Sequence, residues 1–175
     1  PEMASLDCGT MNFGGDDIFV NTENMIIEFA ARMNERGIKP ELECFDKSQI
    51  DMALRLVRKG HIQPPLHFNF VLGVNGGVTG TPRDLLFLKE SLPEGATFTV
   101  TGVGRCQLDM NVMGMLLGGH VRVGFEDNLK YNRERNAISN AEFVERIVRI
   151  AKELNLEIAT PAEARQILGM PERAK

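Results

Sequence analysis

The sequence predicts an α/β fold: a (β/α)8 TIM barrel of which this chain covers about the last five βα units. Short apolar stretches typical of strands alternate five times with longer stretches of helical periodicity, the pattern of a parallel sheet with right-handed crossovers. Each repeat takes roughly 30 residues, so eight repeats would need about 250, the usual barrel length. With 175 residues, we expect a single domain over residues 1–175 that forms the C-terminal portion of a barrel.

The expected strands are short runs in which apolar and polar residues alternate, and turn residues follow each of them. The expected helices have capping signals at their starts: Ser139 can cap with Glu142 three residues later, and Thr81 and Thr160 each precede a first-turn proline. The strands are expected at 3–7, 41–45, 66–72, 97–101 and 120–124, and the helices at 23–36, 48–59, 82–91, 106–117 and 141–154.

The two faces of these strands differ in polarity. In residues 66–72, for example, Phe68 and Phe70 share one face, whereas His67 and Asn69 share the other. An open doubly wound sheet has helices on both faces, so its central strands should be apolar on both. A barrel packs only its outer strand surface on helices and can have a polar lumen near an active site. We therefore favour the barrel over the open sheet.

The chain starts on PEMASLDCG, without an initiator methionine or the pattern of a signal peptide. We expect the first three strands of the barrel to be missing or supplied by another chain. An isolated piece would expose strand edges and its lumen, so an N-terminal barrel segment is expected to be needed to complete the site.

Composition excludes several classes of function. The net charge of -4, the pI near 5.5 and the lack of a basic block argue against a nucleic-acid or anionic-membrane partner. No apolar run approaches the roughly 18 residues that cross a bilayer. Three widely spaced cysteines without a C-x-x-C pair fit a reducing cytoplasm.

Charged residues gather after the last expected strand, in GHVRVGFEDN. Strand C-termini face the active site of a barrel, so Glu126 and Asp127 could bind a divalent metal or act as a base, with Arg122 beside them. The alternative is a solvated loop with a salt bridge in the lumen. Glu41 and Glu43 share the polar face of the second strand, where a cation is expected, or an ion pair that only orders the barrel.

Two glycine-rich loops follow the third and fourth strands. VLGVNGGVTGTPRDL, residues 71–85, is expected to contact substrate through Gly73, Asn75, Gly76 and Gly77, because glycine lets a backbone approach an anion. TGVGRCQ, residues 101–107, adds Arg105. Neither loop has P-loop or Rossmann spacing, and the alternative is an ordinary turn.

Taken together, the motifs resemble those of the β-keto acid cleavage enzyme family. The resemblance spans nearly the whole chain in family order. Its segments are PEMASLDCGTMNFG, ELECFD, FVLGVNGGVTGTP, GHVRVGFEDN, SNAEFVERIVRIAKELN and ATPAEARQILG.

The resemblance implies a metal-dependent transfer between a β-keto acid and acetyl-CoA that gives acetoacetate and a new CoA thioester. In that family zinc is held by an H-x-H pair on an early strand and by the glutamate that corresponds to Glu126. Asp127 then acts in proton transfer, Arg122 pairs with Glu126 and the substrate, Glu43 is a further active-site acid, and Ser5 contacts the substrate. The resemblance also implies a homo-oligomer.

This chain has no H-x-H motif, and one carboxylate does not make a three-ligand catalytic zinc site. We therefore expect the chain alone to be inactive and Zn²⁺, or another divalent metal, to bind in the complete protein. Three alternatives stay open: a different metal-assisted aldolase or hydrolase, a CoA- or phosphate-binding module whose acids are structural, and a structural part of a split barrel.

Overall fold

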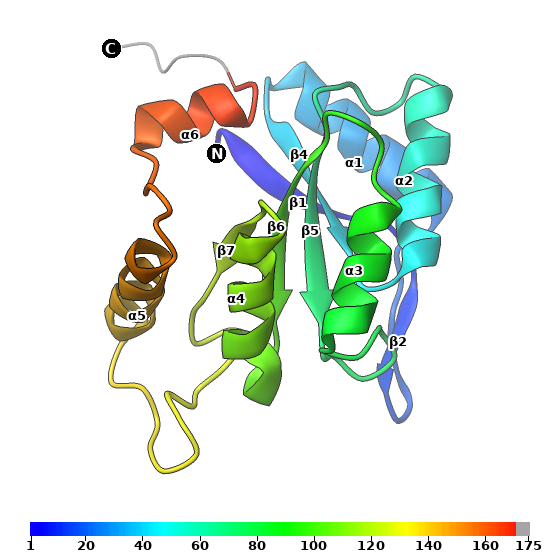
Figure 1. Cartoon of the computed structure of the whole chain (residues 1–175). Coiled ribbons are helices and arrows are strands. Elements are labelled where there is room, and N and C mark those ends of the chain that lie inside the picture. Colours follow the sequence, from blue (N-terminus) through cyan, green and yellow to red (C-terminus); the bar gives the residue numbers. More distant parts are fainter. Residues whose placement is uncertain (171–175) are drawn as a thin grey trace.

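The computed structural model describes residues 1–170, and its centre is a curved sheet of five parallel strands (Figure 1). The last residues of the expected domain, 171–175, lie outside the described part. The strands follow each other in the sheet in sequence order, as in a barrel. They are β1 (Met3–Asp7), β4 (Lys39–Cys44), β5 (His67–Leu72), β6 (Thr97–Gly102) and β7 (His120–Arg122).

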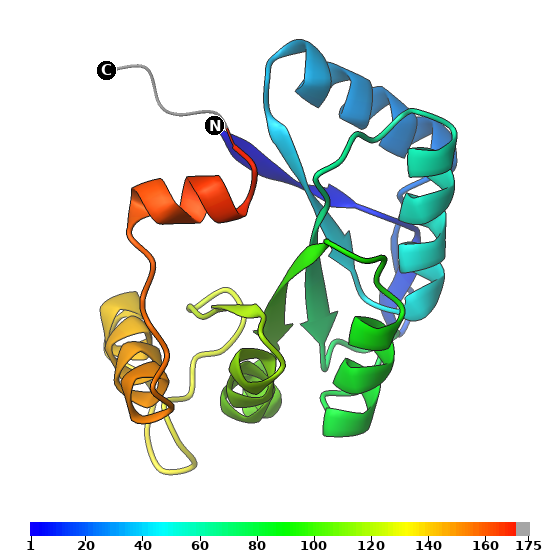
Figure 2. The ribbon, with the colours of Figure 1, turned by 45° about the horizontal axis from the view of Figure 1, so that its top comes forward.

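Four helices cover the convex side of the sheet (Figure 2). Helix α1 packs on β1 and β4, α2 on β4, α3 on β5, and α4 on β6 and β7, while α5 packs beside α4. The short α6 lies near the start of β1, where Arg165 pairs with Glu2 at 2.8 Å. The helices are α1 (Glu23–Glu35), α2 (Lys47–Arg58), α3 (Pro82–Glu90), the 3-10 turn η1 (Gly104–Cys106), α4 (Gln107–Leu116), α5 (Asn140–Glu153) and α6 (Pro161–Ile167).

Side-chain caps start most of these helices, and the predicted capping residues are confirmed. Ser139 accepts the backbone N–H of Glu142, and Thr81 accepts that of Asp84. Thr160 and Glu163 form a complete capping box. No helix of residues 1–170 is long and apolar enough to cross a membrane.

The polarity of the strands matches this arrangement. Buried apolar side chains such as Leu42, Phe68 and Val100 point from the sheet to the helices and form the main core. The alternate residues, among them Glu43, Asn69 and Thr101, lie on the concave side. Helices on one face only exclude the doubly wound sheet, and the predicted partial barrel is confirmed.

Strand β4 starts at Lys39, two residues before the expected position, and α6 adds a helix to the expected ranges. Two further differences from the prediction lie near the site. A hairpin of β2 (Met11–Gly14) and β3 (Asp17–Phe19) interrupts the loop between β1 and α1. Strand β7 ends at Arg122, two residues early, because the last pair of its ladder with β6 is Thr101 and Arg122. The hairpin and the loop between β7 and α5 both lie at the C-terminal end of the sheet (Figure 1).

Candidate active site

Polar side chains from four neighbouring strands form a layer on the concave face near the C-terminal end of the sheet. Glu43 of β4 is level with Asn69 of β5, and Thr101 of β6 is level with Arg122 of β7. Asn69 Nδ2 donates to Glu43 Oε2 at 3.1 Å, and Thr101 Oγ1 donates to Asn69 Oδ1 at 2.8 Å. These bonds connect three strands and fix the orientation of the Glu43 carboxyl group.

Arg122 joins this layer to the loop that follows β7. Its Nε and Nη2 atoms donate to Asp127 Oδ2 and Oδ1 at 3.1 and 2.8 Å. Its Nη1 atom lies 3.6 Å from Glu43 Oε2, and Nη2 lies 3.2 Å from Glu126 Oε2. The structure therefore brings together four of the predicted residues. One guanidinium faces three carboxyl groups, which leaves excess negative charge at this end of the lumen.

Glu43 is the carboxyl group whose protonation the site changes most clearly. Its side chain is only 14% exposed. Burial and, to a smaller extent, the negative charge of Asp7 raise the pKa of Glu43, Arg122 opposes both effects, and the resulting pKa is about 7. A carboxyl group with a pKa near neutrality can both take up and release a proton at physiological pH.

Asp127 is also buried, and it accepts more hydrogen bonds than Glu43 does. Both of its carboxylate oxygens accept bonds from Arg122, and its backbone oxygen accepts the N–H of Gly104 at 2.8 Å. Burial raises the pKa of Asp127, whereas the hydrogen bonds and charge of Arg122 lower it. Asp127 therefore fixes Arg122 in place at the end of β7.

Glu126 lies at the rim, with 85% of its side chain exposed and its carboxylate beside Arg122. Within residues 1–170, no group of three or more His, Cys, Asp or Glu side chains is placed to hold a metal ion. The described residues thus do not form a three-ligand zinc site by themselves. Glu126 is a candidate for one ligand only.

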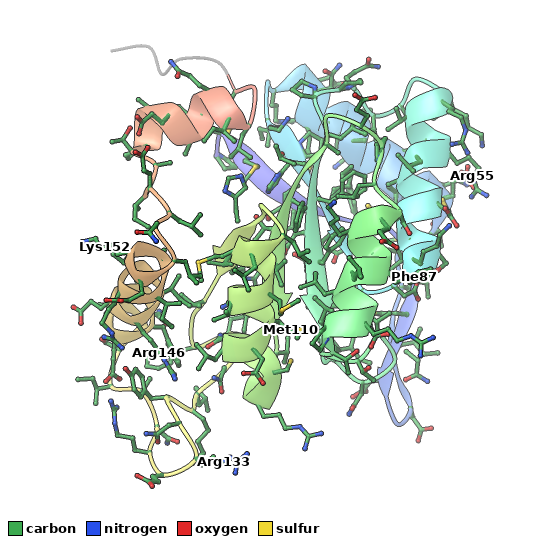
Figure 3. The ribbon with its side chains drawn as sticks, viewed as in Figure 1. Arg55, Phe87, Met110, Arg133, Arg146 and Lys152 are labelled. Atoms are coloured by element: carbon green, nitrogen blue, oxygen red, sulfur yellow. The ribbon has the colours of Figure 1, made fainter. Side chains whose placement is uncertain are left out.

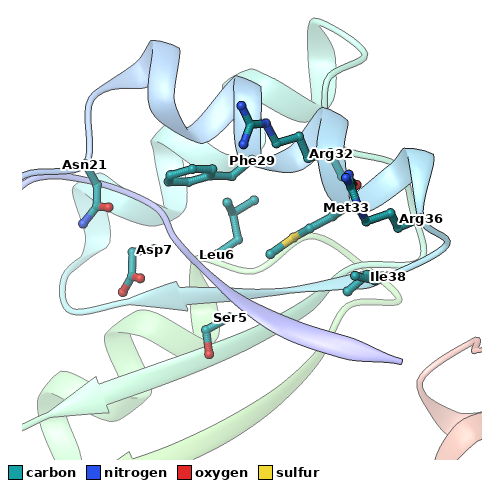
Figure 4. Close-up of a pocket in the computed structure, with 9 residues that line it drawn as sticks. All are labelled: Ser5, Leu6, Asp7, Asn21, Phe29, Arg32, Met33, Arg36 and Ile38. Carbon is teal, nitrogen blue, oxygen red and sulfur yellow. Dashed lines mark hydrogen bonds between the residues drawn. The ribbon is translucent and has the colours of Figure 1, made fainter. Parts of the chain in front are cut away.

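Ser5 belongs to a second layer, one step toward the N-terminal end of the strands. Its Oγ atom donates to Glu41 Oε2 at 3.4 Å, and Glu41 lies 3.7 Å from the ring of His67. His67 is buried, with Thr97 and Thr99 within hydrogen-bonding distance of its two ring nitrogens. Ser5 also lines a cavity of about 340 Å³ along β1 and α1 (Figure 4).

The first glycine-rich loop packs against other parts of the chain. A Cβ atom on Gly76 would lie 1.6 Å from the backbone oxygen of Asn12, and Gly77 lies against Phe45. Gly73 packs on Cys106, and the side chain of Asn75 contacts Gly14. The close backbone approach that these glycines allow is therefore made, in the described chain, to the β2–β3 hairpin and to neighbouring loops.

Several residues of this site were not singled out from the sequence. Asn69 and Thr101 orient Glu43, and Asp7 raises its pKa. The period-two alternation already placed all three on the polar face. Their role depends on which residues are level across the strands, and that register is set by the folded sheet.

Comparison with a family model and with curated proteins places the chain in one enzyme family. The family model described as "BKACE: beta-keto acid cleavage enzyme" matches residues 1–170. Two curated relatives carry the name 3-keto-5-aminohexanoate cleavage enzyme. The chain is 62% identical to that of Acetoanaerobium sticklandii and 59% identical to that of Fusobacterium nucleatum, each over 170 residues, 97% of this chain and 62% of the relative. The chain thus spans about three fifths of the length of these relatives.

More distant similarity extends the comparison. A 3-oxoadipate:acetyl-CoA acetyltransferase of Cupriavidus necator is 37% identical over 175 residues, which cover 98% of this chain and 61% of the relative. The apo structure of ObcA superposes with a TM-score of 0.85 at 21% identity, covering 97% of this chain and 44% of ObcA. A ternary complex of ObcA with a C4-CoA adduct and oxalate superposes with a TM-score of 0.82, covering 97% and 45%. At this identity the likeness to ObcA shows the fold.

Proposed function

The chain belongs to the beta-keto acid cleavage enzyme family. From this membership we propose that the whole protein catalyses a transfer reaction between a β-keto acid and acetyl-CoA. The products are acetoacetate and a new CoA thioester. Two relatives at 62% and 59% identity are named for 3-keto-5-aminohexanoate, so this β-keto acid is the first substrate to test. Because the chain spans only part of these relatives, the activity is proposed for the whole protein.

The observation that supports the proposal best is the Glu43 carboxyl group, with its pKa raised to about 7 mainly by burial, 3.6 Å from Arg122. The carbon between the keto group and the carboxylate of a β-keto acid must lose a proton before it can form a new bond. Glu43 accepts that proton, and Asn69 holds its carboxylate in position. Arg122 stabilises the negative charge that develops on the substrate oxygens.

The family resemblance assigns proton transfer to Asp127, and the geometry suggests a division of labour. Both oxygens of Asp127 accept hydrogen bonds from Arg122, so its carboxylate is less free to approach a substrate proton than that of Glu43. We therefore assign the first proton removal to Glu43. Asp127 orients Arg122 and remains the second candidate for proton transfer.

Metal dependence is a separate part of the proposal. The gathering of three carboxyl groups, Glu43, Glu126 and Asp127, around the single guanidinium of Arg122 supports it, because a nearby cation favours the charged form of carboxylates that crowd together. A bound divalent ion would supply Lewis-acid chemistry, with Glu126 as one ligand and the others from outside the described residues. Elemental analysis of the whole protein and its Glu126→Gln variant tests this: the variant should contain less metal. Equal metal content in both would exclude Glu126 as a ligand.

The remaining expectations are part of the same proposal. Ser5, Gly73, Asn75, Gly76 and Gly77 are proposed to contact substrate. The protein is proposed to act in the cytoplasm, where its free cysteines would stay reduced. It is also proposed to be a homo-oligomer, which light scattering of the whole protein tests.

The decisive experiment measures acetoacetate. The whole protein is incubated with acetyl-CoA and each of 3-keto-5-aminohexanoate and 3-oxoadipate, the keto acids in the names of the relatives reported above. We expect acetoacetate from at least the first, and only when acetyl-CoA is present. Glu43→Gln should lower kcat by about 10² to 10⁴-fold, whereas Glu145→Gln, the same change at an exposed position on α5, should leave it unchanged. No acetoacetate from any of the keto acids would overturn the proposal.

A further inference from the structure

A second cavity, of about 820 Å³, lies at the C-terminal ends of β6 and β7 between η1, α4, α5 and the loop after Asp127. Gly104 lines it and donates its N–H to the backbone oxygen of Asp127. Asn128, the residue after Asp127, lines it as well. The cavity thus adjoins the candidate active site, and its volume is in the range of small-molecule sites.

The walls of this cavity are cationic. Arg105, Lys130, Arg133 and Arg146 line it, and among the lining residues that the structure describes Asp109 is the one carboxylate. Within residues 1–170, the first three of these cations have no carboxylate within 4 Å. Arg146 of α5 donates to the backbone oxygen of Tyr131 and lies over its ring, so it holds the loop in place. Figure 3 labels Arg146 on α5 and Arg133 in this loop.

Two residues that line the same cavity have amide side chains with a buried atom that lacks a hydrogen-bond partner among residues 1–170. Gln107 is 3% exposed and Asn111 is fully buried. Within the described part of the chain, Gln107 Nε2 and Asn111 Oδ1 have no hydrogen-bond partner. Each amide is fixed by its other atom: Gln107 Oε1 accepts from Asn128, and Asn111 Nδ2 donates to the backbone oxygen of Arg122, both at 3.2 Å. Buried polar atoms almost always have a partner, so a fixed donor and a fixed acceptor here indicate a polar ligand.

The start of α4 adds to the attraction for anions. This helix has ten residues and directly follows η1, and no side chain of the described residues caps its N-terminus. The partial positive charge of a helix N-terminus favours phosphate groups. Cationic walls, a helix start and unused amide atoms together suit a ligand that carries both phosphates and neutral polar groups.

We propose that this cavity binds the phosphate-bearing end of the CoA thioester; the assignment rests on the proposed function. Arg105, Lys130 and Arg133 contact the phosphates, and Gln107 and Asn111 bind neutral polar groups of the same molecule. The thioester end then extends past Gly104 and Asn128 toward Arg122 and Glu43. This places the CoA site on the α4–α5 side of β7, whereas the first glycine-rich loop packs on the β2–β3 hairpin.

The test measures the KM of the whole protein for acetyl-CoA and for acetyl-pantetheine, a shorter thioester. The double variant Arg105→Ala/Arg133→Ala should raise the KM for acetyl-CoA about tenfold or more, with kcat and the KM for the keto acid unchanged. With acetyl-pantetheine, which lacks the phosphates, variant and wild type should have the same KM. The control Arg58→Ala/Arg149→Ala removes two exposed arginines outside the cavity and should match the wild type with both esters.

Either of two results would overturn the assignment: an unchanged KM for acetyl-CoA, or an equal rise with acetyl-pantetheine. Calorimetric titration with CoA alone keeps the test independent of turnover, and the double variant should bind CoA about tenfold more weakly. Equal CoA affinity of variant and wild type would refute the site. So would inorganic phosphate binding as tightly as CoA. A wild type that binds CoA here but forms no acetoacetate would refute the proposed reaction and leave the site intact.

Discussion

Burial and the negative charge of Asp7 raise the pKa of Glu43 to about 7, from an ordinary value of 4.5. The unfolded chain therefore releases this proton at lower pH than the native protein does. Between these two pKa values the native state binds more protons, so its stability falls as pH rises through this range. The difference amounts to about 3 kcal/mol above pH 7.

Glu43→Gln should remove this pH-dependent loss of stability. We expect the variant to gain stability over the wild type between pH 5 and pH 8, by about 2 to 3 kcal/mol, while it loses activity. Urea unfolding of both proteins at the two pH values measures this. A difference between the proteins that stays constant with pH would contradict the raised pKa, and Glu145→Gln serves as the matched control.

Arg122 neutralises a carboxylate that is almost completely buried, because Asp127 is 7% exposed. Arg122→Ala should therefore cost about 3 kcal/mol of unfolding free energy, since the buried charge loses its partner. The double variant Arg122→Ala/Asp127→Ala should cost clearly less than the two single variants added together. Equilibrium unfolding of the four proteins gives the coupling, and strict additivity would show that the pair contributes little.

At the scale of elements, the main strands and helices could be predicted from the sequence, whereas the β2–β3 hairpin could not. The strands and the following helices were predictable because each obeys local rules of alternation and capping. The β2–β3 hairpin escaped prediction because its strands are short and partly exposed. It is stabilised by contacts with distant segments, among them the edge-on rings of Phe13 and Phe45 and the close approach of Gly76 to Asn12.

Because Gly76 packs against the backbone of the hairpin, a substitution there should cost more stability than a substitution at an ordinary turn glycine. Gly76→Ala should cost about 3 kcal/mol, because its Cβ would overlap the backbone of Asn12 and its φ is +86°. Gly95 has a similar φ of +79° but open space around it, so Gly95→Ala should cost only about 1 kcal/mol. Urea unfolding gives the loss of unfolding free energy for each variant. Equal losses would show that the hairpin moves away from the new methyl group.

For the whole molecule, the sheet of residues 1–170 has β1 and β7 as its two edge strands. Its concave face carries the Glu43 and Arg122 layer, which a complete barrel would enclose. The chain also spans about three fifths of the length of its curated relatives. The remaining part of such a barrel would supply the closing strands and, if the proposed metal binds, its other ligands.

We therefore expect residues 1–175 alone to form no acetoacetate from acetyl-CoA and a β-keto acid, in contrast to the whole protein. Circular dichroism of the isolated chain should first establish that it is folded, so that inactivity reflects an incomplete site. Adding a segment that supplies the rest of the barrel in trans should restore part of the activity. Turnover by the folded chain alone, at a rate close to that of the whole protein, would contradict this.

The sequence by itself determined the alternation of strands and helices, the polar inner face and the cluster of charged residues after the last strand. These features are local: they depend on spacing along the chain, and the resemblance to the family rests on the same residues. Only the tertiary structure decided that the pKa of Glu43 is raised to about 7, and that Gln107 and Asn111 line a cationic cavity. Burial and partner geometry depend on segments far apart in sequence, and those distances exist only once the chain has folded.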